Sequence, residues 1–252
     1  MSEAMEAEFD TVAEWTAELA RDLGPEYHIP AGCRGSGNPA ALDWLVDRLQ
    51  LRPGEVLLDC GAGVGGPAAY AADRTPVSPV LVEPQAGACR AARTLFPYPV
   101  VQATAGALPF PDNAFDAAWC LGVLCTTSDQ LGVLTELRRV VRPPGRIGLL
   151  VFVAQQDLDA DQQPDGNNFP TRDSLPKLLS AAGLRVDAEL CTADLPAIPH
   201  AWEQCVDTVD EELRRRHART RTWQLSEQQS DQMGTLLGDG LVVGVVMSVR
   251  HA

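Results

Sequence analysis

The chain has 252 residues, a formal net charge of −14 and a pI near 4.6, and 45% of its residues are apolar. This length and apolar content suit one large domain with a substantial core and exclude global disorder. The acidic balance lacks the basic footprint of a nucleic-acid-binding protein, and anionic membrane surfaces would repel the chain as a whole. We therefore expect a small-molecule partner, no nucleic acid and no membrane, with the oligomeric state left open.

The cysteines and the first residues indicate a cytoplasmic protein without metal. The start, MSEAMEAEFD, has no apolar stretch of a signal peptide, and no apolar run approaches the ~18 residues that span a bilayer. The seven cysteines are scattered without Cys-x-x-Cys spacing, which predicts reduced thiols. No zinc-type cluster is visible, and the alternating Asp157, Asp159 and Asp161 lack the calcium-loop pattern, so no metal is expected.

The N-terminal part is predicted to be helical. Residues 3–23 place apolar side chains on one face and acids, Asp10 among them, on another, at helical spacing. The following GPEYHIPAGCRGSGNP is rich in glycine and proline and is predicted to be a loop. Asn38 is a suitable cap for a helix over 39–50.

The middle of the chain alternates between apolar strands and helical segments. The predicted strands are EVLLDC, SPVLVE, YPVVQA, FDAAWCL and RIGLLVFVA. Two more follow, LRVDAELC and LVVGVVMSVR, separated by about fifty residues with helical spacing. This pattern predicts an α/β fold with a Rossmann-like, mostly parallel sheet flanked by helices, an N-terminal helical lid, and a helical insert before the last strand.

The glycine turn after the first strand fits two ligands. Gly61, Gly63 and Gly66 match the dinucleotide pattern G-x-G-x-x-G, and Glu83 follows where an acid would hold a ribose. Gly61, Gly63 and Gly65 equally fit the shorter glycine loop of a methyl-donor site. The glycines alone leave a nicotinamide dinucleotide and a methyl donor as alternatives.

Asp59, two residues before the turn, favours the methyl donor. A pyrophosphate on the following helix N-terminus would be repelled by a carboxylate there, whereas a cationic ligand end would be attracted. S-adenosylmethionine carries an ammonium and a sulfonium and has no phosphate. The alternative role for Asp59 is to cap the turn through backbone amides. Glu83, at the end of the second strand, would suit the ribose of either ligand.

Four segments in order resemble the class I S-adenosylmethionine-dependent methyltransferases, especially those acting on small molecules: VLLDCGAGVGG, LVEPQ, ALPFPDNAFDAAWCLGVL and LTELRRVVRPPGRIGLLVF. They cover about residues 54–153. The resemblance implies S-adenosylmethionine as cofactor and assigns roles along the chain. Asp59 orients the methionine end and Glu83 binds the ribose. The remaining implied contacts are the close backbone approach at Gly61, Gly63 and Gly65, the adenine at the backbone of Ala105, and the ammonium at the carbonyl of Leu121.

One position departs from that pattern. The family often places Asp before the ALPFPD run to accept a hydrogen bond from the adenine amine, and Thr104 stands there in this chain. A hydroxyl accepts the same bond without charge assistance.

Methyl transfer needs alignment, exclusion of water and, for a protonated nucleophile, a general base. His28 and Tyr27 lie in the predicted loop, and in this family the N-terminal segment commonly folds over the donor; we expect both to help close the site. His200, at the start of the helical insert, is a second catalytic candidate. Either histidine can instead be an ordinary loop or helix-start residue.

These observations predict S-adenosylmethionine-dependent methyl transfer to a small-molecule acceptor in biosynthesis, with O-methylation slightly favoured because it is common in the family. The alternatives are a donor-bound protein of the same fold that catalyses a cyclisation or rearrangement, a binding module, and a nucleotide-linked oxidoreductase. The predicted organisation is an N-terminal helix and lid loop (1–38), a donor-binding core (39–195), a helical cap insert (196–238) and a final core strand (239–252).

Overall fold

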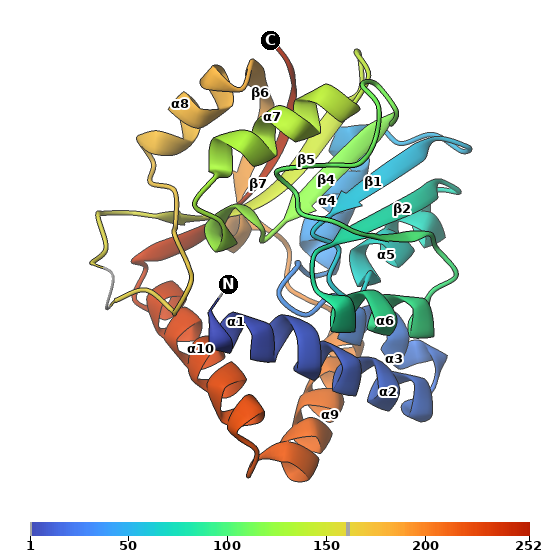
Figure 1. Cartoon of the computed structure of the whole chain (residues 1–252), viewed down its shortest axis with the longest axis vertical. Coiled ribbons are helices and arrows are strands. Elements are labelled where there is room, and N and C mark those ends of the chain that lie inside the picture. The colour runs from blue at the N-terminus through green and yellow to red at the C-terminus, as the bar shows by residue number, and fades with distance from the viewer. Residues whose placement is uncertain (1, 160–161) are drawn as a thin grey trace.

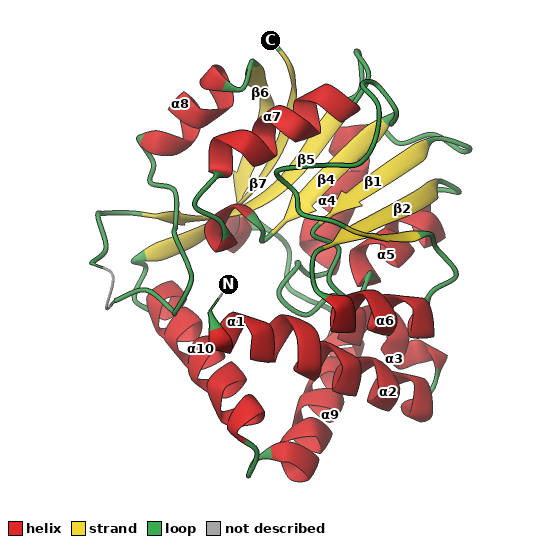
Figure 2. Cartoon of the chain, viewed as in Figure 1, coloured by secondary structure: helices red, strands yellow, loops and turns green. Residues whose placement is uncertain are grey.

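A single twisted sheet of seven strands forms the centre of the molecule (Figures 1 and 2). The computed structural model describes residues 2–159 and 162–252, so Asp161 of the acidic loop lies outside the described residues. The strands are β1 (Val56–Cys60), β2 (Ser78–Glu83), β3 (Val100–Gln102), β4 (Ala117–Leu121), β5 (Arg146–Ala154), β6 (Leu184–Cys191) and β7 (Val242–His251). Their order across the sheet is β3-β2-β1-β4-β5-β7-β6.

The sheet confirms the prediction of a mostly parallel, Rossmann-like core. Strands β1 to β5 are parallel to one another, whereas β7 runs antiparallel to both of its neighbours, β5 and β6. The order reverses at β1, where β2 continues to one side and β4 to the other. In open α/β sheets, ligands bind beyond the carboxyl ends of the strands at this reversal. The fold therefore directs attention to the turn after β1.

Helices cover both faces of the sheet and one end of it. The helical elements are α1 (Glu3–Glu6), η1 (Ala7–Val12), α2 (Ala13–Leu23), α3 (Pro25–Gly32), α4 (Pro39–Leu49), α5 (Gly66–Arg74), α6 (Ala86–Leu95), η2 (Leu124–Thr126), α7 (Gln130–Val140), α8 (Ser174–Ala181), η3 (Thr192–Asp194), α9 (His200–His217) and α10 (Arg221–Gly238). The Asn38 side chain accepts from the N–H of Ala41 and caps α4 as predicted.

The core is divided between the two faces of the sheet. On one face, α7 and α8 pack against strand residues such as Leu58 and Ile147. On the other, α4 and α5 pack against residues such as Leu57 and Trp119. The strands are apolar on both sides because both sides are covered, which is why their sequences read as continuous apolar runs.

A separate cluster joins the N-terminal helices to the insert. Side chains of α2 and α6 pack with Val209 and Leu213 of α9 and Trp223 of α10. Figure 1 shows α1, α2, α9 and α10 gathered on one side of the sheet, and α9 and α10 form the helical insert predicted before the last strand. No helix within the described ranges is both long and apolar enough to cross a bilayer.

Two details of the N-terminal part differ from the prediction. The stretch predicted as a loop contains helix α3, because Pro25 occupies its first turn, where proline is tolerated, and Gly24 breaks the chain before it. The predicted single helix over 3–23 contains a π-helical stretch, η1, at residues 7–12. Such stretches are rare and frequently mark functional positions.

Candidate active site

The glycine turn connects β1 to α5 through three residues with positive φ. The φ values are 75° for Gly61, 52° for Gly63 and 90° for Gly65. A Cβ at Gly61 would overlap the Val123 side chain, and one at Gly65 would lie 2.6 Å from Leu81 Cδ2. A Cβ at Gly63 would meet no atom within 4 Å. Of these three glycines, only Gly63 faces open space, as expected where a ligand approaches the backbone.

Glu83 fastens this turn to the end of β2. Its Oε2 accepts from the N–H of Gly63 at 3.0 Å, and its Oε1 accepts from the N–H of Gln85 at 3.0 Å. Burial raises the pKa of Glu83; the two backbone N–H groups oppose that rise, and the nearby Asp10 adds to it. Each carboxylate oxygen keeps a second lone pair, so Glu83 retains acceptor capacity for a ligand hydroxyl.

Asp59 is a buried carboxyl at the end of β1 with 1% of its surface exposed. Its Oδ2 has no hydrogen-bond partner in the part of the chain that the structure describes. Burial raises the pKa of Asp59 to about 7; the Trp119 side chain and the Ala68 backbone N–H oppose the rise, and Glu83 adds to it. A buried carboxylate with an unpaired oxygen is costly when ionised, so Oδ2 is suited to a hydrogen-bond donor or a cation from outside the chain.

The carboxyl groups at this end of the sheet therefore fit S-adenosylmethionine better than a dinucleotide. Asp59, Glu83 and Asp10 bring three carboxyls to the same end of the sheet, close enough for Glu83 to affect Asp59 and for Asp10 to affect Glu83. Such a negative field favours an ammonium and a sulfonium and opposes a pyrophosphate. The open space at Gly63 gives a ligand access to the backbone there.

The other positions predicted to bind the methyl donor lie at the same end of the sheet, beyond the carboxyl ends of the strands. Leu121 ends β4 and is buried, and β4 is the neighbour of β1. Thr104 and Ala105 follow β3; Thr104 is exposed, and its carbonyl accepts from the N–H of Ala107 in a turn. The sheet order places the ends of β3 and β4 on opposite sides of Asp59 and Glu83.

The two catalytic candidates occupy different surroundings. Tyr27 and His28 lie in α3, where Tyr27 packs against the cluster shared by α2, α6 and α9. The Nε2 atom of His28 is buried and has no hydrogen-bond partner within the described chain. His200 begins α9, is largely exposed, and has its Nδ1 4.0 Å from Glu203 Oε2. His200 lines a cavity that His28 does not line.

Asp10 and Trp119 are residues near the site to which the sequence analysis gave no role in it. The Asp10 carboxylate accepts from the N–H of Gly87 at the start of α6, so the polar face of the N-terminal helix docks there rather than facing solvent. Trp119 lies in β4 beside Asp59. Neither has a sequence signal: an acid on an amphipathic helix and an aromatic in a buried strand are ordinary features.

In the segment after β4, the Thr126, Thr127 and Asp129 side chains form local hydrogen bonds, and Asp129 caps α7.

No group of three or more His, Cys, Asp or Glu side chains in the described ranges is arranged to hold a metal ion. The seven cysteines are free thiols.

The comparisons with known proteins identify a methyltransferase domain in this chain. Residues 58–149 match the family model of a methyltransferase domain. The chain is 28% identical over 189 residues to the methyltransferase GfsG of Streptomyces halstedii, covering 67% of this chain and 68% of that protein. It is 35% identical over 135 residues to 27-O-demethylrifamycin SV methyltransferase of Amycolatopsis mediterranei, covering 48% of each chain.

A solved structure extends the likeness in fold. Geranyl diphosphate C-methyltransferase from Streptomyces coelicolor, in complex with Mg²⁺, geranyl-S-thiolodiphosphate and S-adenosyl-L-homocysteine, has a TM-score of 0.60. It is 15% identical and covers 84% of this chain and 76% of its own. The glycine turn beside Asp59 lies within the region that matches the methyltransferase model. The chain thus contains a methyltransferase domain, and the family match and the relatives indicate an S-adenosylmethionine-dependent methyltransferase with S-adenosylmethionine as its cofactor.

Proposed function

We propose that this enzyme transfers a methyl group from S-adenosylmethionine to an oxygen atom of a small molecule. The observation that carries the donor assignment to these residues is the buried, unpartnered Oδ2 of Asp59, which an ammonium would satisfy as both hydrogen-bond donor and cation. Oxygen as the accepting atom is supported by the relative from A. mediterranei, whose name specifies an O-demethylated substrate. The acidic chain, with its net charge of −14, favours a small acceptor over nucleic acid.

The proposed donor contacts follow from the geometry at the sheet edge. Ionised Asp59 would hold the ammonium end, and Glu83 would accept from the ribose hydroxyls with the lone pairs that Gly63 and Gln85 leave unused. The backbone at Gly63 would lie against the donor. Thr104 and the backbone of Ala105 would meet the adenine, and the carbonyl of Leu121 would face the ammonium.

When bound, the donor supplies a methyl carbon that its sulfonium already activates. The chain's task is then to align the acceptor oxygen, exclude water and remove a proton if the oxygen carries one. We propose His28 and His200 as candidate bases, with Tyr27 helping to close the site. Loss of a general base costs about 10²–10⁴ in rate, so His28→Gln and His200→Gln identify the base by the fall in kcat.

The experiment is incubation with S-[methyl-¹⁴C]adenosylmethionine and a panel of hydroxylated small molecules, followed by product analysis. Label in an O-methyl product with one S-adenosylhomocysteine formed per methyl transferred supports the proposal. Label on carbon or nitrogen overturns the choice of oxygen. Conversion of a substrate that requires the donor yet forms no S-adenosylhomocysteine supports the alternative of a cyclisation or rearrangement.

A further inference from the structure

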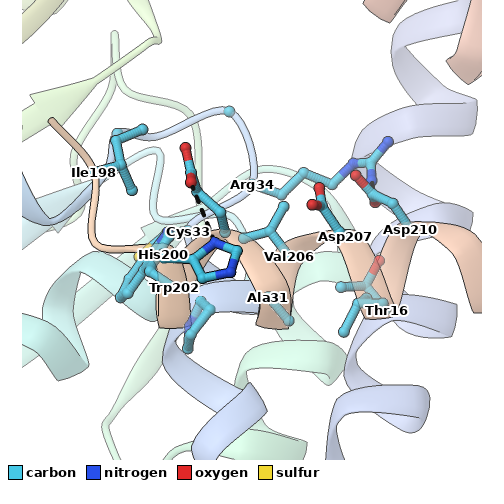
Figure 3. Close-up of a pocket in the computed structure, with 15 residues that line it drawn as sticks. Thr16, Ala31, Cys33, Arg34, Ile198, His200, Trp202, Val206, Asp207 and Asp210 are labelled. Atoms are coloured by element: carbon cyan, nitrogen blue, oxygen red, sulfur yellow. Dashed lines mark hydrogen bonds and ion pairs between the residues drawn. The ribbon is translucent and has the colours of Figure 1, made fainter.

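A cavity of about 540 Å³ lies between the segment 30–37 and helix α9 (Figure 3). This volume lies within the range of pockets that hold drug-sized ligands. The apolar side chains that line it are Pro30, Ala31, Ile198, Trp202, Val206 and Val209. The cavity is thus suited to a ligand with a substantial apolar body.

One wall of the cavity separates it from the donor end of the sheet. Cys33, Gly35 and Gly37 form this wall. On its other side, the Gly35 carbonyl oxygen lies 2.7 Å from where a Cβ on Gly122, just after β4, would stand. Burial raises the pKa of the Cys33 thiol, and the charge of Asp59 raises it further. A single chain segment therefore stands between the cavity and the proposed methionine end.

Arg34 is the only Lys or Arg in the lining, and it is already engaged. Its Nε donates to Glu8 Oε1 at 2.8 Å, and its Nη1 donates to Asp210 (Figure 3). Burial lowers the pKa of Arg34, but these two carboxylates more than offset that effect and hold the pKa above its ordinary value. A guanidinium paired with two acids has little attraction left for an anionic ligand.

The remaining charges on the cavity wall are negative. Glu203 and Asp207, one turn apart on α9, line the cavity with Trp202. Glu203 Oε2 lies 4.0 Å from His200 Nδ1, and the Asp207 side chain has no ion pair or hydrogen bond among the described residues. Carboxylates beside an aromatic ring and an apolar floor form a surface that selects ligands with a cationic nitrogen on an apolar body.

We propose that this cavity binds the methyl acceptor and that the acceptor carries a protonated amine, held by Glu203 and Asp207. The identification of the ligand as the acceptor rests on the proposed function. The amine is the anchor and not the methylated atom, because an ammonium nitrogen has no lone pair for attack on the methyl carbon. The apolar body then extends toward the wall formed by Cys33, Gly35 and Gly37, and this segment must move aside in the complex for the acceptor oxygen to reach the methyl carbon.

The test uses two fluorescent probes that share an apolar body and differ in charge. Dansylcadaverine ends in an ammonium, and dansyl-6-aminohexanoic acid ends in a carboxylate. Fluorescence titration is expected to give dansylcadaverine an affinity at least tenfold higher. Glu203→Gln and Asp207→Asn are each expected to weaken its binding about threefold to tenfold. Glu211→Gln, on the same helix but outside the cavity lining, is the matched control and is expected to leave it unchanged.

Equal affinity for the two probes, or a preference that survives both substitutions together, overturns the inference. Calorimetric measurement of S-adenosylhomocysteine binding to the same proteins distinguishes a failure of this inference from a failure of the proposed function. If S-adenosylhomocysteine binds normally but the amine probe is not preferred, only the proposed acceptor class is rejected. A preference for the amine without S-adenosylhomocysteine binding rejects the proposed donor site, and with it the acceptor role of the cavity.

Discussion

Asp59 combines complete burial, an unused oxygen atom and a pKa of about 7. The carboxyl therefore changes charge within the range in which such an enzyme works. Protonated Asp59 has no charge to offer an ammonium, whereas ionised Asp59 does. We therefore expect the proposed donor site to respond to pH through Asp59 in strand β1.

S-adenosylhomocysteine, whose ammonium carries the nearby positive charge, is expected to bind about tenfold more tightly at pH 8 than at pH 6, because the ionised fraction of a group with this pKa rises by about that factor. Asp59→Asn is expected to bind at least about tenfold more weakly at pH 8 and to lose this pH dependence. Isothermal titration calorimetry across the pH range measures both. An Asn variant that keeps the wild-type affinity would falsify the proposed role of Asp59.

The same residue affects the stability of the ligand-free protein. The folded-state pKa of Asp59, about 7, lies above the unfolded value of about 3.9. The contribution of Asp59 to the free energy of unfolding is therefore highest below pH 4 and falls as pH rises through 7. The three-unit difference corresponds to a loss of about 4 kcal/mol. Urea unfolding of wild type and Asp59→Asn at pH 4, 6 and 8 is expected to show the Asn variant gaining relative stability at each step. A constant difference between the two proteins contradicts the raised pKa.

For the candidate site, the placement of the residues in β1, its turn and β2 was predictable from sequence. Asp59, Gly63 and Glu83 belong to one strand–turn–helix–strand unit, where spacing along the chain fixes spacing in space. Asp10 and Trp119 come from other elements, and only the packed structure brings them to this edge. No local pattern distinguishes a docking acid from a solvated one.

At the scale of elements, the N-terminal helix supplies the cap of α6. Helix α6 has no side-chain cap of its own, and the N–H of Gly87 donates to Asp10 in η1. The neighbouring Arg90 donates to Glu14 at 2.6 Å, which strengthens the same contact. The proline-rich helix α3 was missed because Gly24, Pro25 and Pro30 together resemble loop composition, although a proline in the first turn is compatible with a helix.

Asp10→Ala is expected to lower the free energy of unfolding by about 1 kcal/mol, the usual cost of losing a helix N-cap. It is also expected to loosen the N-terminal helix over α6, because a hydrogen bond between the two elements is lost. Urea denaturation gives the first effect, and hydrogen exchange of the α6 amides gives the second. Asp22→Ala, an exposed residue on α2, is the control. Equal effects of the two substitutions contradict the capping role.

Gly66 has a packing role that its place in the glycine pattern does not reveal. The backbones of Gly66 and Gly32 lie in contact where α5 meets α3, and a Cβ on Gly32 would stand 2.9 Å from the Gly66 Cα. Gly66→Ala is expected to cost about 2–3 kcal/mol, since backbone cannot yield as a side chain can. Gly234→Ala, in α10 with open space around it, is expected to be neutral or stabilising. Thermal unfolding of both variants checks the contrast; equal losses would show that the contact is dispensable.

At the scale of the whole molecule, the core fold followed from sequence. Alternating apolar strands and helices predicted the sheet, and long apolar runs predicted coverage on both faces, because burial requires these patterns. The cavity beside α9 was beyond prediction. It is built from segment 30–37 and an insert about 170 residues later in the chain, and no periodicity encodes which faces of such distant helices meet.

Donor binding is expected to stabilise the entire protein. S-adenosylhomocysteine at about 100 times its Kd adds about 2.7 kcal/mol, which raises Tm by about 5–10 °C for a chain of this size. NADH at the same concentration is expected to give no shift, because three carboxyls face its pyrophosphate. Differential scanning fluorimetry measures both ligands. A larger shift with NADH contradicts the charge argument for the site.

Strand β7 has a consequence for synthesis in the cell. It fills the gap between β5 and β6, yet 87 residues separate the end of β5 at Ala154 from its start at Val242. While the ribosome makes that stretch, the apolar edge of β5 has no partner and β6 has no neighbour at all. Unpaired apolar edges invite association with other chains. We therefore expect the nascent protein to depend on chaperones or on rapid completion over this interval, and slow codons between residues 155 and 241 to lower its yield.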